Sequence, residues 1–236
     1  MPLPWRTARL VGRHDETATA RTLLLDAPGW PGHVAGQHVD VRLTADDGYQ
    51  AARSYSLAAP ADGGRLEVGV QPVTGGEVSP YLADDLPIGA SVEVRGPLGN
   101  WFVWRPEQDE PVLLVAGGSG VVPLMAMVRA HRQAASTSPF QLIHSVRGEA
   151  DLWYRAELGG TDPALDVRFL FTRQAPPGGT RAAGRLTAAD LEPALKRLTP
   201  AGTVYVCGPT GFVEAAADLL TSAGQDPATI RTERFG

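Results

Sequence analysis

The sequence predicts two domains of different class: an antiparallel, Greek-key-like β-barrel over residues 1–105, and an α/β domain with a parallel sheet over residues 106–236. In the first half, short apolar runs are separated by turn residues, and helical periodicity is almost absent. After Pro111, strand-length apolar runs alternate with segments of helical periodicity. Between the halves, Trp104–Pro111 (WRPEQDEP) replaces the apolar alternation with charge and proline, which is typical of a domain boundary.

The composition is that of a globular protein. Of the 236 residues, 43% are apolar and 20% are charged, and the 27 glycines and 20 prolines indicate many loops without reaching the level of a disordered chain. The formal net charge of −5 argues against a nucleic-acid-binding surface. The single cysteine excludes an internal disulfide and a four-cysteine iron–sulfur cluster within this sequence. No signal peptide or membrane-spanning run is evident, so we expect a cytoplasmic location without membrane contact, and we assign no metal ligands.

The barrel half contains six predicted strands. They are Thr7–Gly12, Ala18–Leu25, His38–Leu43, Ala52–Leu57, Arg65–Gln71 and Ser91–Arg95. A short helix is predicted over Ser79–Asp85, after the glycine turn Gly75-Gly76. This turn could hold a phosphate with its backbone, or it could be an ordinary loop between strands.

The second half alternates strands and helices. The predicted strands are Val112–Ala116, Phe140–Ser145, Asp166–Phe171 and Thr203–Cys207, and the predicted helices are Pro123–Ala135, Asp151–Leu158, Ala188–Leu198 and Gly211–Ala223. Parallel sheets of this kind bind ligands beyond the carboxyl ends of their strands. The segments that follow the predicted strands are glycine-rich or polar, and we expect them to meet at one edge: Gly117–Gly120, Arg147, Thr172-Arg173 and Cys207–Pro209.

The stretch from Pro111 to Ala130 (PVLLVAGGSGVVPLMAMVRA) has the order strand, glycine turn, helix, which brings a backbone close to a phosphate. It departs from the dinucleotide fingerprint in two respects. Pro123 stands where the third glycine is expected, and no acidic residue follows about twenty positions later. On this stretch alone, a nucleotide site and a plain βα turn both stay open.

The barrel half also carries Arg53-Ser54-Tyr55-Ser56-Leu57-Ala58. An arginine within a strand is favourable where it meets an anion. Tyr55 can lay its ring against a planar ligand, and the Ser56 hydroxyl can hydrogen-bond to polar ring atoms. The alternative is an edge strand with a solvated arginine and a tyrosine in the core.

Four motifs in order resemble the ferredoxin–NADP reductase superfamily: RSYSLA at 53–58, GGEVS at 75–79, GGSGVVP at 117–123 and CGPTG at 207–211. The segments AGQH at 35–38 and GPLG at 96–99 resemble two further family features, the first with alanine in place of proline. The resemblance covers the chain from about Arg6 to Phe235. It implies a flavin-binding barrel followed by a nicotinamide-nucleotide domain, with hydride passing between the two cofactors.

The resemblance also implies residue roles. In the barrel, the flavin residues would be Arg53 on the phosphate, Tyr55 beside the isoalloxazine, Ser56 near its N5, Ser54 within the same motif, and Gly75, Gly76, Val78 and Ser79 around the pyrophosphate. In the second domain, the nucleotide residues would be Gly118, Ser119, Gly120, Cys207, Gly208 and Pro209, with Cys207 close to the nicotinamide C4. Cys207 could equally be a small buried hydrophobic residue at a strand end.

The C-terminal Arg231–Gly236 resembles the E-x-F ending of bacterial relatives. Glu233 would then assist the hydride path, and Phe235 would cover the flavin until the nicotinamide displaces it. Together with Ser56 and Cys207, Glu233 completes the predicted catalytic set. The alternative is a frayed tail.

The resemblance favours FAD over FMN, because GGEVS matches a pyrophosphate-binding segment. Thr172-Arg173 match the pair that binds the 2′-phosphate in NADP-using relatives, and Arg147 and Arg181 add positive charge on the same predicted edge. NADPH is therefore favoured over NADH, unless these are solvated loop arginines. Val122 stands where many relatives have threonine beside the nicotinamide.

The predicted function is a flavin-dependent NAD(P)H oxidoreductase. Because this sequence contains no ferredoxin-like or globin segment, we expect a separate acceptor, such as a ferredoxin or an oxygenase partner. Two alternatives are a flavin or ferric reductase that acts on small diffusible acceptors, and an electron-transfer or regulatory subunit that does not turn over free NAD(P)H.

Overall fold

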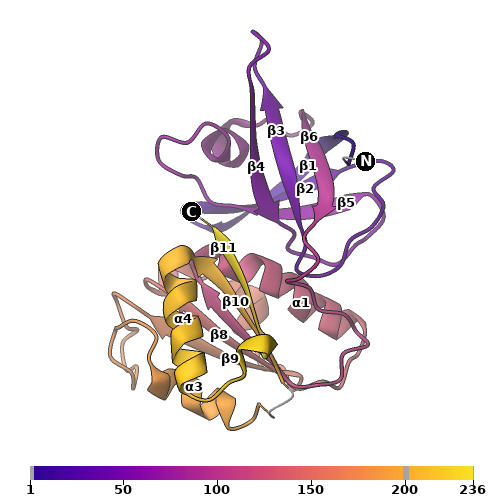
Figure 1. Cartoon of the computed structure of the whole chain (residues 1–236). Coiled ribbons are helices and arrows are strands. Elements are labelled where there is room, and N and C mark those ends of the chain that lie inside the picture. Colours follow the sequence, from indigo (N-terminus) through magenta and orange to yellow (C-terminus); the bar gives the residue numbers. More distant parts are fainter. Residues whose placement is uncertain (1–2, 199–201, 236) are drawn as a thin grey trace. The chain divides into compact units, whose positions relative to one another are not determined.

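A computed structural model describes residues 3–198 and 202–235 of the chain. By their contacts the residues form two compact units. Unit 1 comprises Met1–Arg105 with Met125–Ala130, and unit 2 comprises Pro106–Leu124 with His131–Gly236. Each unit has a sheet of its own (Figure 1), so the two are described separately.

Unit 1 is an antiparallel barrel, as predicted. Its strands are β1 (Arg6–Thr17), β2 (Ala20–Asp26), β3 (His38–Thr44), β4 (Gln50–Ser56), β5 (Arg65–Val70) and β6 (Ser91–Leu98). They are ordered β4-β3-β6-β1-β2-β5, so β6 lies between β1 and β3, as in Greek-key arrangements. The sheet closes just beyond β4, where Leu57 pairs with Val68 and the Ala58 N–H donates to the Glu67 carbonyl at 2.8 Å.

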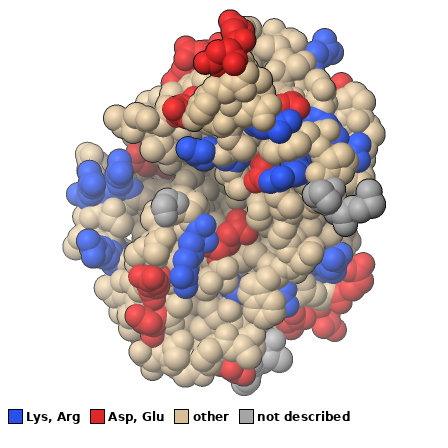
Figure 2. Space-filling view, turned by 45° about the horizontal axis from the view of Figure 1, so that its top comes forward, with Lys and Arg blue, Asp and Glu red and all other residues tan. Residues whose placement is uncertain are grey.

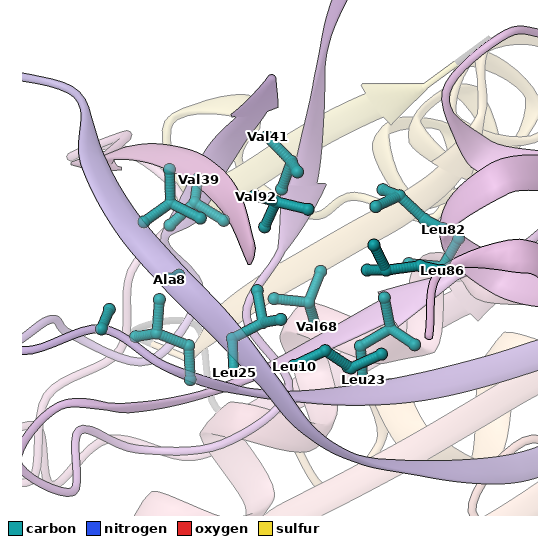
Figure 3. Close-up of a cluster of buried hydrophobic side chains, with 14 of the residues drawn as sticks. Ala8, Leu10, Leu23, Leu25, Val39, Val41, Val68, Leu82, Leu86 and Val92 are labelled. Carbon is teal, nitrogen blue, oxygen red and sulfur yellow. The ribbon is translucent and has the colours of Figure 1, made fainter. Parts of the chain in front are cut away.

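Alternating side chains of these strands fill the barrel. In β5, Leu66, Val68 and Val70 are buried and their neighbours are not, which is the period of two expected of a half-buried strand. Leu82, from the π-helical turn η1 (Tyr81–Asp85), and Leu86 just after it add to this core, and Figure 3 shows both side chains directed at the strands. Truncating a buried leucine such as Leu10 to alanine would destabilise the unit by about 2–5 kcal/mol.

Unit 2 is an α/β domain with a parallel sheet, as predicted. Its strands are β7 (Val112–Gly117), β8 (Phe140–Val146), β9 (Leu165–Phe171), β10 (Thr203–Pro209) and β11 (Ile230–Phe235), ordered β11-β10-β7-β8-β9. Its helices are α1 (Val121–Gln133), α2 (Arg155–Leu158), α3 (Ala188–Leu195) and α4 (Thr210–Ser222), with 3-10 turns η2 (Gly118–Gly120), η3 (Glu149–Asp151) and η4 (Pro227–Thr229). Helices α3 and α4 cover one face of the sheet through apolar side chains from both layers, including Leu113, Val206, Leu191 and Leu220.

One strand of unit 2 was missed and one predicted helix was wrong. β11 pairs in parallel with β10 and adds a fifth strand, so the chain up to Phe235 is not the frayed tail that stood as the alternative for the C-terminus. Gly236 lies outside the described residues. The helix expected over Asp151–Leu158 is confined to α2 at its end, because Tyr154 adopts a left-handed conformation (φ 54°) that no α-helix continues through.

Candidate functional site

The first candidate site lies on β4, an end strand of the hydrogen-bonded order. Arg53 and Tyr55 share one face of β4, because their register partners Val41 and Val39 both belong to the barrel core. Arg53 is nevertheless exposed, and its Nη1 donates to the Ala52 carbonyl at 2.7 Å. It forms no ion pair with any described residue. The exposed side chain of Arg53 agrees with the alternative of a solvated arginine on an edge strand. A guanidinium without an ion-pair partner is also what an anion-binding site requires, so both interpretations stay open.

Tyr55 is half-buried, and its hydroxyl is buried without a hydrogen-bond partner among the described residues. Burial raises the pKa of Tyr55 to about 12, whereas the charge of Arg53 and the nearby Ser79 hydroxyl act in the opposite direction. Arg53 and Ser79 therefore lie close to Tyr55, although the two motifs are separate in sequence. A buried polar atom without a partner is costly, and a polar ligand group would satisfy it.

The loop before η1 offers backbone donors next to these side chains. It is shaped by two hydrogen bonds, from the Gly76 N–H to the Val73 carbonyl (2.8 Å) and from the Val73 N–H to Ser79 Oγ (3.1 Å). Gly75 has a φ of +74°, a conformation that glycine adopts without strain. Within the described chain, the N–H groups of residues 77, 78 and 79 have no hydrogen-bond partner. Consecutive unpaired N–H groups beside an arginine form a donor set that suits a pyrophosphate.

Val78 and the two serines of the motif contribute differently. Val78 is buried in the barrel core and so anchors the loop. Ser54 lies on the opposite face of β4 from Arg53, where its hydroxyl donates to Asp40 Oδ1 at 2.6 Å, and Asp40 is in turn ion-paired with Arg95. The Ser54 hydroxyl is thus engaged within the protein, and we leave it out of the proposed site. Ser56 is half-buried opposite His38, and its flavin contact stays a prediction.

In unit 2, the two predicted glycine motifs meet between β7 and β10. These strands are neighbours at the centre of the sheet, and the chain reverses its direction across the sheet there, which makes this the topological switch point where α/β domains bind ligands. A Cβ on Gly120 would overlap the Cys207 carbonyl oxygen, and one on Gly208 would lie 3.1 Å from the Cα of Gly117. These glycines are therefore required for the close approach of the two turns. Gly118, with a φ of +55°, faces open space together with the half-exposed Ser119.

Cys207 is 0% exposed at the end of β10. Burial raises the pKa of its thiol well above the ordinary value, and the charge of Glu233, its register partner on β11, acts in the same direction. The thiol is therefore neutral at physiological pH and is not a thiolate nucleophile. Phe235 is exposed opposite Pro209. The proposed nicotinamide and flavin contacts of these residues stay predictions.

One residue of this site was missed by the sequence analysis. His144, in β8, is fully buried, and its Nε2 lies 3.0 Å from the Gly118 carbonyl, to which it must donate. Burial lowers the pKa of His144 to about 4, so the ring is neutral at physiological pH. In the sequence, the one sign of this role was a histidine within the apolar run FQLIHSV. Through this hydrogen bond, His144 fixes the backbone of Gly118, the glycine with positive φ in the turn.

A pair of exposed arginines follows β8 and β9. The Arg173 N–H donates to the Arg147 carbonyl at 3.0 Å, and the Thr172 N–H donates to the Val146 carbonyl at 2.8 Å, so the two segments stay paired beyond the strands. Both arginine side chains are exposed, and neither has an ion-pair partner among the described residues. The edge predicted from the sequence thus carries two neighbouring cations.

Arg181 does not join them. Its guanidinium donates to both carboxylate oxygens of the buried Asp190, at 2.7 and 2.8 Å. It also donates to the carbonyls of Ala182, Gly184 and Arg185. These contacts use all five of its N–H donors. We therefore withdraw Arg181 from the predicted phosphate site and assign it to holding this loop against the start of α3.

The described residues contain no group of three or more histidine, cysteine, aspartate or glutamate side chains placed to hold a metal ion. None of the helices seen in residues 3–198 and 202–235 is long and apolar enough to cross a membrane. On the face shown in Figure 2, basic and acidic side chains are intermingled.

Comparison with known proteins shows which family this is. The family model described as an oxidoreductase FAD-binding domain matches residues 14–103, and the oxidoreductase NAD-binding domain matches residues 114–218. The chain is 32% identical to the reductase subunit of an aromatic O-demethylase from Amycolatopsis, over 99% of this chain and 70% of that protein. The chain belongs to the ferredoxin–NADP reductase superfamily.

A second curated relative and a solved structure are also similar to the chain. A reductase component of naphthalene 1,2-dioxygenase/salicylate 5-hydroxylase systems from Ralstonia is 32% identical over 85% of this chain and 60% of its own length. The crystal structure of an Amycolatopsis cytochrome P450 reductase superposes with a TM-score of 0.85 and 29% identity, over 99% of this chain and 70% of that chain. The matched part of this chain corresponds to 50–70% of the full length of four curated relatives, which include the two named here.

Proposed function

We propose that this chain is a flavin-dependent NAD(P)H oxidoreductase that passes electrons from NAD(P)H, through FAD bound to the barrel, to a separate redox-protein acceptor. The observation that carries this proposal is the donor set of unit 1: among the described residues, Arg53 has no ion-pair partner, the N–H groups of residues 77–79 have no acceptor, and the buried Tyr55 hydroxyl has no hydrogen bond. They adjoin one another in a domain that the FAD-binding family model matches.

In this proposal Arg53 and the N–H groups of residues 77–79 neutralise and hold the pyrophosphate. Tyr55 lies beside the isoalloxazine ring, and Ser56 donates a hydrogen bond near N5. Gly75 and Gly76 let the backbone turn towards the phosphates, and Val78 fixes the loop to the core. When bound, the flavin supplies the redox chemistry, because it accepts a hydride and releases electrons singly.

In unit 2, Gly118, Ser119 and Gly120 would receive the nicotinamide nucleotide together with Cys207, Gly208 and Pro209. The neutral, buried thiol of Cys207 presents no charge to the nicotinamide. Glu233, beside it in register, would orient the ring. Phe235 would cover the flavin when no nucleotide is bound.

We propose NADPH as the preferred nucleotide. Arg147 and Arg173 are exposed, adjacent and unpaired among the described residues, and a 2′-phosphate dianion between them would form charge-assisted hydrogen bonds, with Thr172 as a further donor. The Arg173→Ala variant should raise the KM for NADPH roughly tenfold and leave the KM for NADH almost unchanged. Arg155, which is paired with Glu149 at 3.4 Å, provides the matched control: Arg155→Ala should change neither. An equal rise in the KM for NADPH and the KM for NADH in Arg173→Ala would refute the role of Arg173 in binding the 2′-phosphate.

The acceptor is proposed from the relatives. Those named above are reductase components of an aromatic O-demethylase and of naphthalene 1,2-dioxygenase/salicylate 5-hydroxylase systems. We propose an acceptor of the same class, an oxygenase or the ferredoxin that serves one.

The test is direct. The protein should purify with flavin, or bind it when supplied, and chromatography of the released cofactor should identify FAD. In stopped-flow experiments, NADPH should bleach the flavin absorbance faster than NADH. A protein that binds no flavin would refute the proposed function, and one that binds FAD but is not reduced by either nucleotide would be an electron-transfer subunit.

A further inference from the structure

We propose that Arg13, on β1, is a positioning residue for the pyrophosphate of FAD. Its guanidinium fixes the π-helical turn η1, and η1 in turn fixes the loop that carries the N–H donors of residues 77–79. This inference rests on the proposed function and deepens it, because it names a residue that acts on the phosphate site through the backbone and not by direct contact.

Arg13 lies on the face of β1 that the barrel core occupies. Its register partner on β2 is the buried core residue Leu23, and residues directly opposite each other in an antiparallel pair share one face of the sheet. The register shifts between Leu10 and Gly12, and such a bulge re-aims the side chains that follow it. A charged side chain on this face needs polar partners, because burying a charge without them is costly.

The partners of Arg13 are two main-chain carbonyls at the end of η1. Its Nη2 donates to the Leu86 carbonyl at 2.5 Å and to the Leu82 carbonyl at 3.4 Å. The Leu86 N–H donates to the Tyr81 carbonyl at 2.7 Å, and the next residue, Pro87, has no N–H with which to continue the helical pattern to Leu82. Within the described chain, these two carbonyls are the only hydrogen-bond partners of the Arg13 guanidinium, so its contacts are directed entirely at η1.

The other end of η1 is joined to the proposed phosphate-binding loop. The Leu82 N–H donates to the Val78 carbonyl at 3.0 Å, and Val78 is the middle one of the three residues whose N–H groups would bind the pyrophosphate. Leu82 therefore connects the two, since its N–H meets the loop and its carbonyl meets Arg13. Hydrogen bonds to a phosphate depend on distance and direction, so a shift of η1 would misplace these donors.

A second arginine reaches η1 at the protein surface and provides a contrast. Arg21 Nη2 lies 3.4 Å from Asp84 Oδ1, and the Asp84 side chain is 52% exposed. Arg21 also pairs with Asp15 at 3.0 Å. Exposed ion pairs contribute little to the structure they join. Asp84→Asn is therefore a matched control, because it alters a contact on the same turn without touching the two carbonyls.

The test compares FAD with riboflavin, which has the isoalloxazine ring but no phosphate. Both affinities are measured by flavin fluorescence titration of apoprotein. Arg13→Met keeps the length of the side chain and removes its donors. It should weaken FAD binding roughly tenfold, about the effect of losing one hydrogen bond to a charged group, and leave riboflavin binding within about twofold. Arg13→Lys retains a donor and should recover most of the FAD affinity, whereas Asp84→Asn should change neither affinity.

Hydrogen exchange of the flavin-free protein gives a second measurement, which needs no ligand. In Arg13→Met, the amides of Leu82 and Leu86 should exchange several-fold faster than in the unaltered protein, because η1 opens more readily. The amide of Leu23, in β2, should keep its rate. This difference would separate a loosened η1 from a loosened barrel.

The inference fails if Arg13→Met binds FAD as tightly as the unaltered protein does. It is also overturned if Arg13→Met weakens FAD and riboflavin alike, if exchange accelerates throughout the barrel, or if the variant does not fold, because Arg13 would then support the barrel as a whole. Each of these results leaves the proposed function intact. An unaltered protein that does not bind FAD would instead refute the proposed function.

Discussion

Arg53→Ala gives the sharpest test of the barrel site. Because the guanidinium makes a single hydrogen bond, to the Ala52 carbonyl, and no ion pair with a described residue, its removal should change the free energy of unfolding by less than about 0.5 kcal/mol. A hydrogen bond to a charged group contributes about 1.5–3 kcal/mol, so the dissociation constant for FAD should rise roughly 10- to 150-fold.

The assay is flavin fluorescence titration of apoprotein, with thermal denaturation as the stability measurement. Arg65→Ala removes another exposed arginine of the barrel, on β5, and should leave the FAD affinity unchanged. Arg53→Ala should also raise the pKa of Tyr55 further, because the charge of Arg53 lowers it, and ultraviolet titration of the phenol can measure this. An unchanged FAD affinity in Arg53→Ala would refute the assignment of the phosphate to this edge.

The remaining predictions concern unit 2. His144→Leu should raise the KM for the nicotinamide nucleotide several-fold without changing FAD affinity, because the Gly118 carbonyl loses its donor, whereas His144→Gln should largely restore it; a normal KM in His144→Leu would contradict this role. Arg181→Ala should destabilise the protein by about 2 kcal/mol in thermal denaturation, because the buried Asp190 loses the closer of its two arginine partners and keeps only Arg168, at 3.3 Å. The native contacts lower the pKa of the Asp190 carboxyl, so the ionised carboxylate stabilises the fold at pH values above its unfolded-state pKa. This stabilisation is lost as the pH falls through the lower pKa of the native state. If Arg181→Ala still destabilises the protein after Asp190 is protonated, the ion pair is not the cause. Cys207 should resist alkylation by iodoacetamide at pH 8 until the protein is denatured, and reaction at the rate of an exposed thiol would disprove its burial.

The glycine motif at the start of unit 2 combines two requirements. Gly120 is needed because its backbone lies against the Cys207 carbonyl, while Gly118 supplies a left-handed conformation in open space. Gly120 is thus explained by packing against the CGP turn, whereas Gly118 presents its backbone in open space.

The sequence by itself determined the class of both domains. Period-two alternation in the first half and alternating strand and helix patterns in the second are local properties, and local patterns set which faces are buried. It did not reveal β11, because Arg231, Glu233 and Arg234 give that strand no apolar alternation. Its pairing with β10 is a tertiary contact that the local pattern does not contain.

The candidate site divides in the same way. The order of four motifs was enough to nominate Arg53, Tyr55 and the glycine turns. Only the tertiary structure decided which charged and polar groups stay available to a ligand, because ion pairs and hydrogen bonds form between residues that are distant in sequence. Arg53 has no such partner among the described residues, whereas Arg181 is fully engaged by Asp190, and His144 reaches Gly118 only after β7 and β8 have paired.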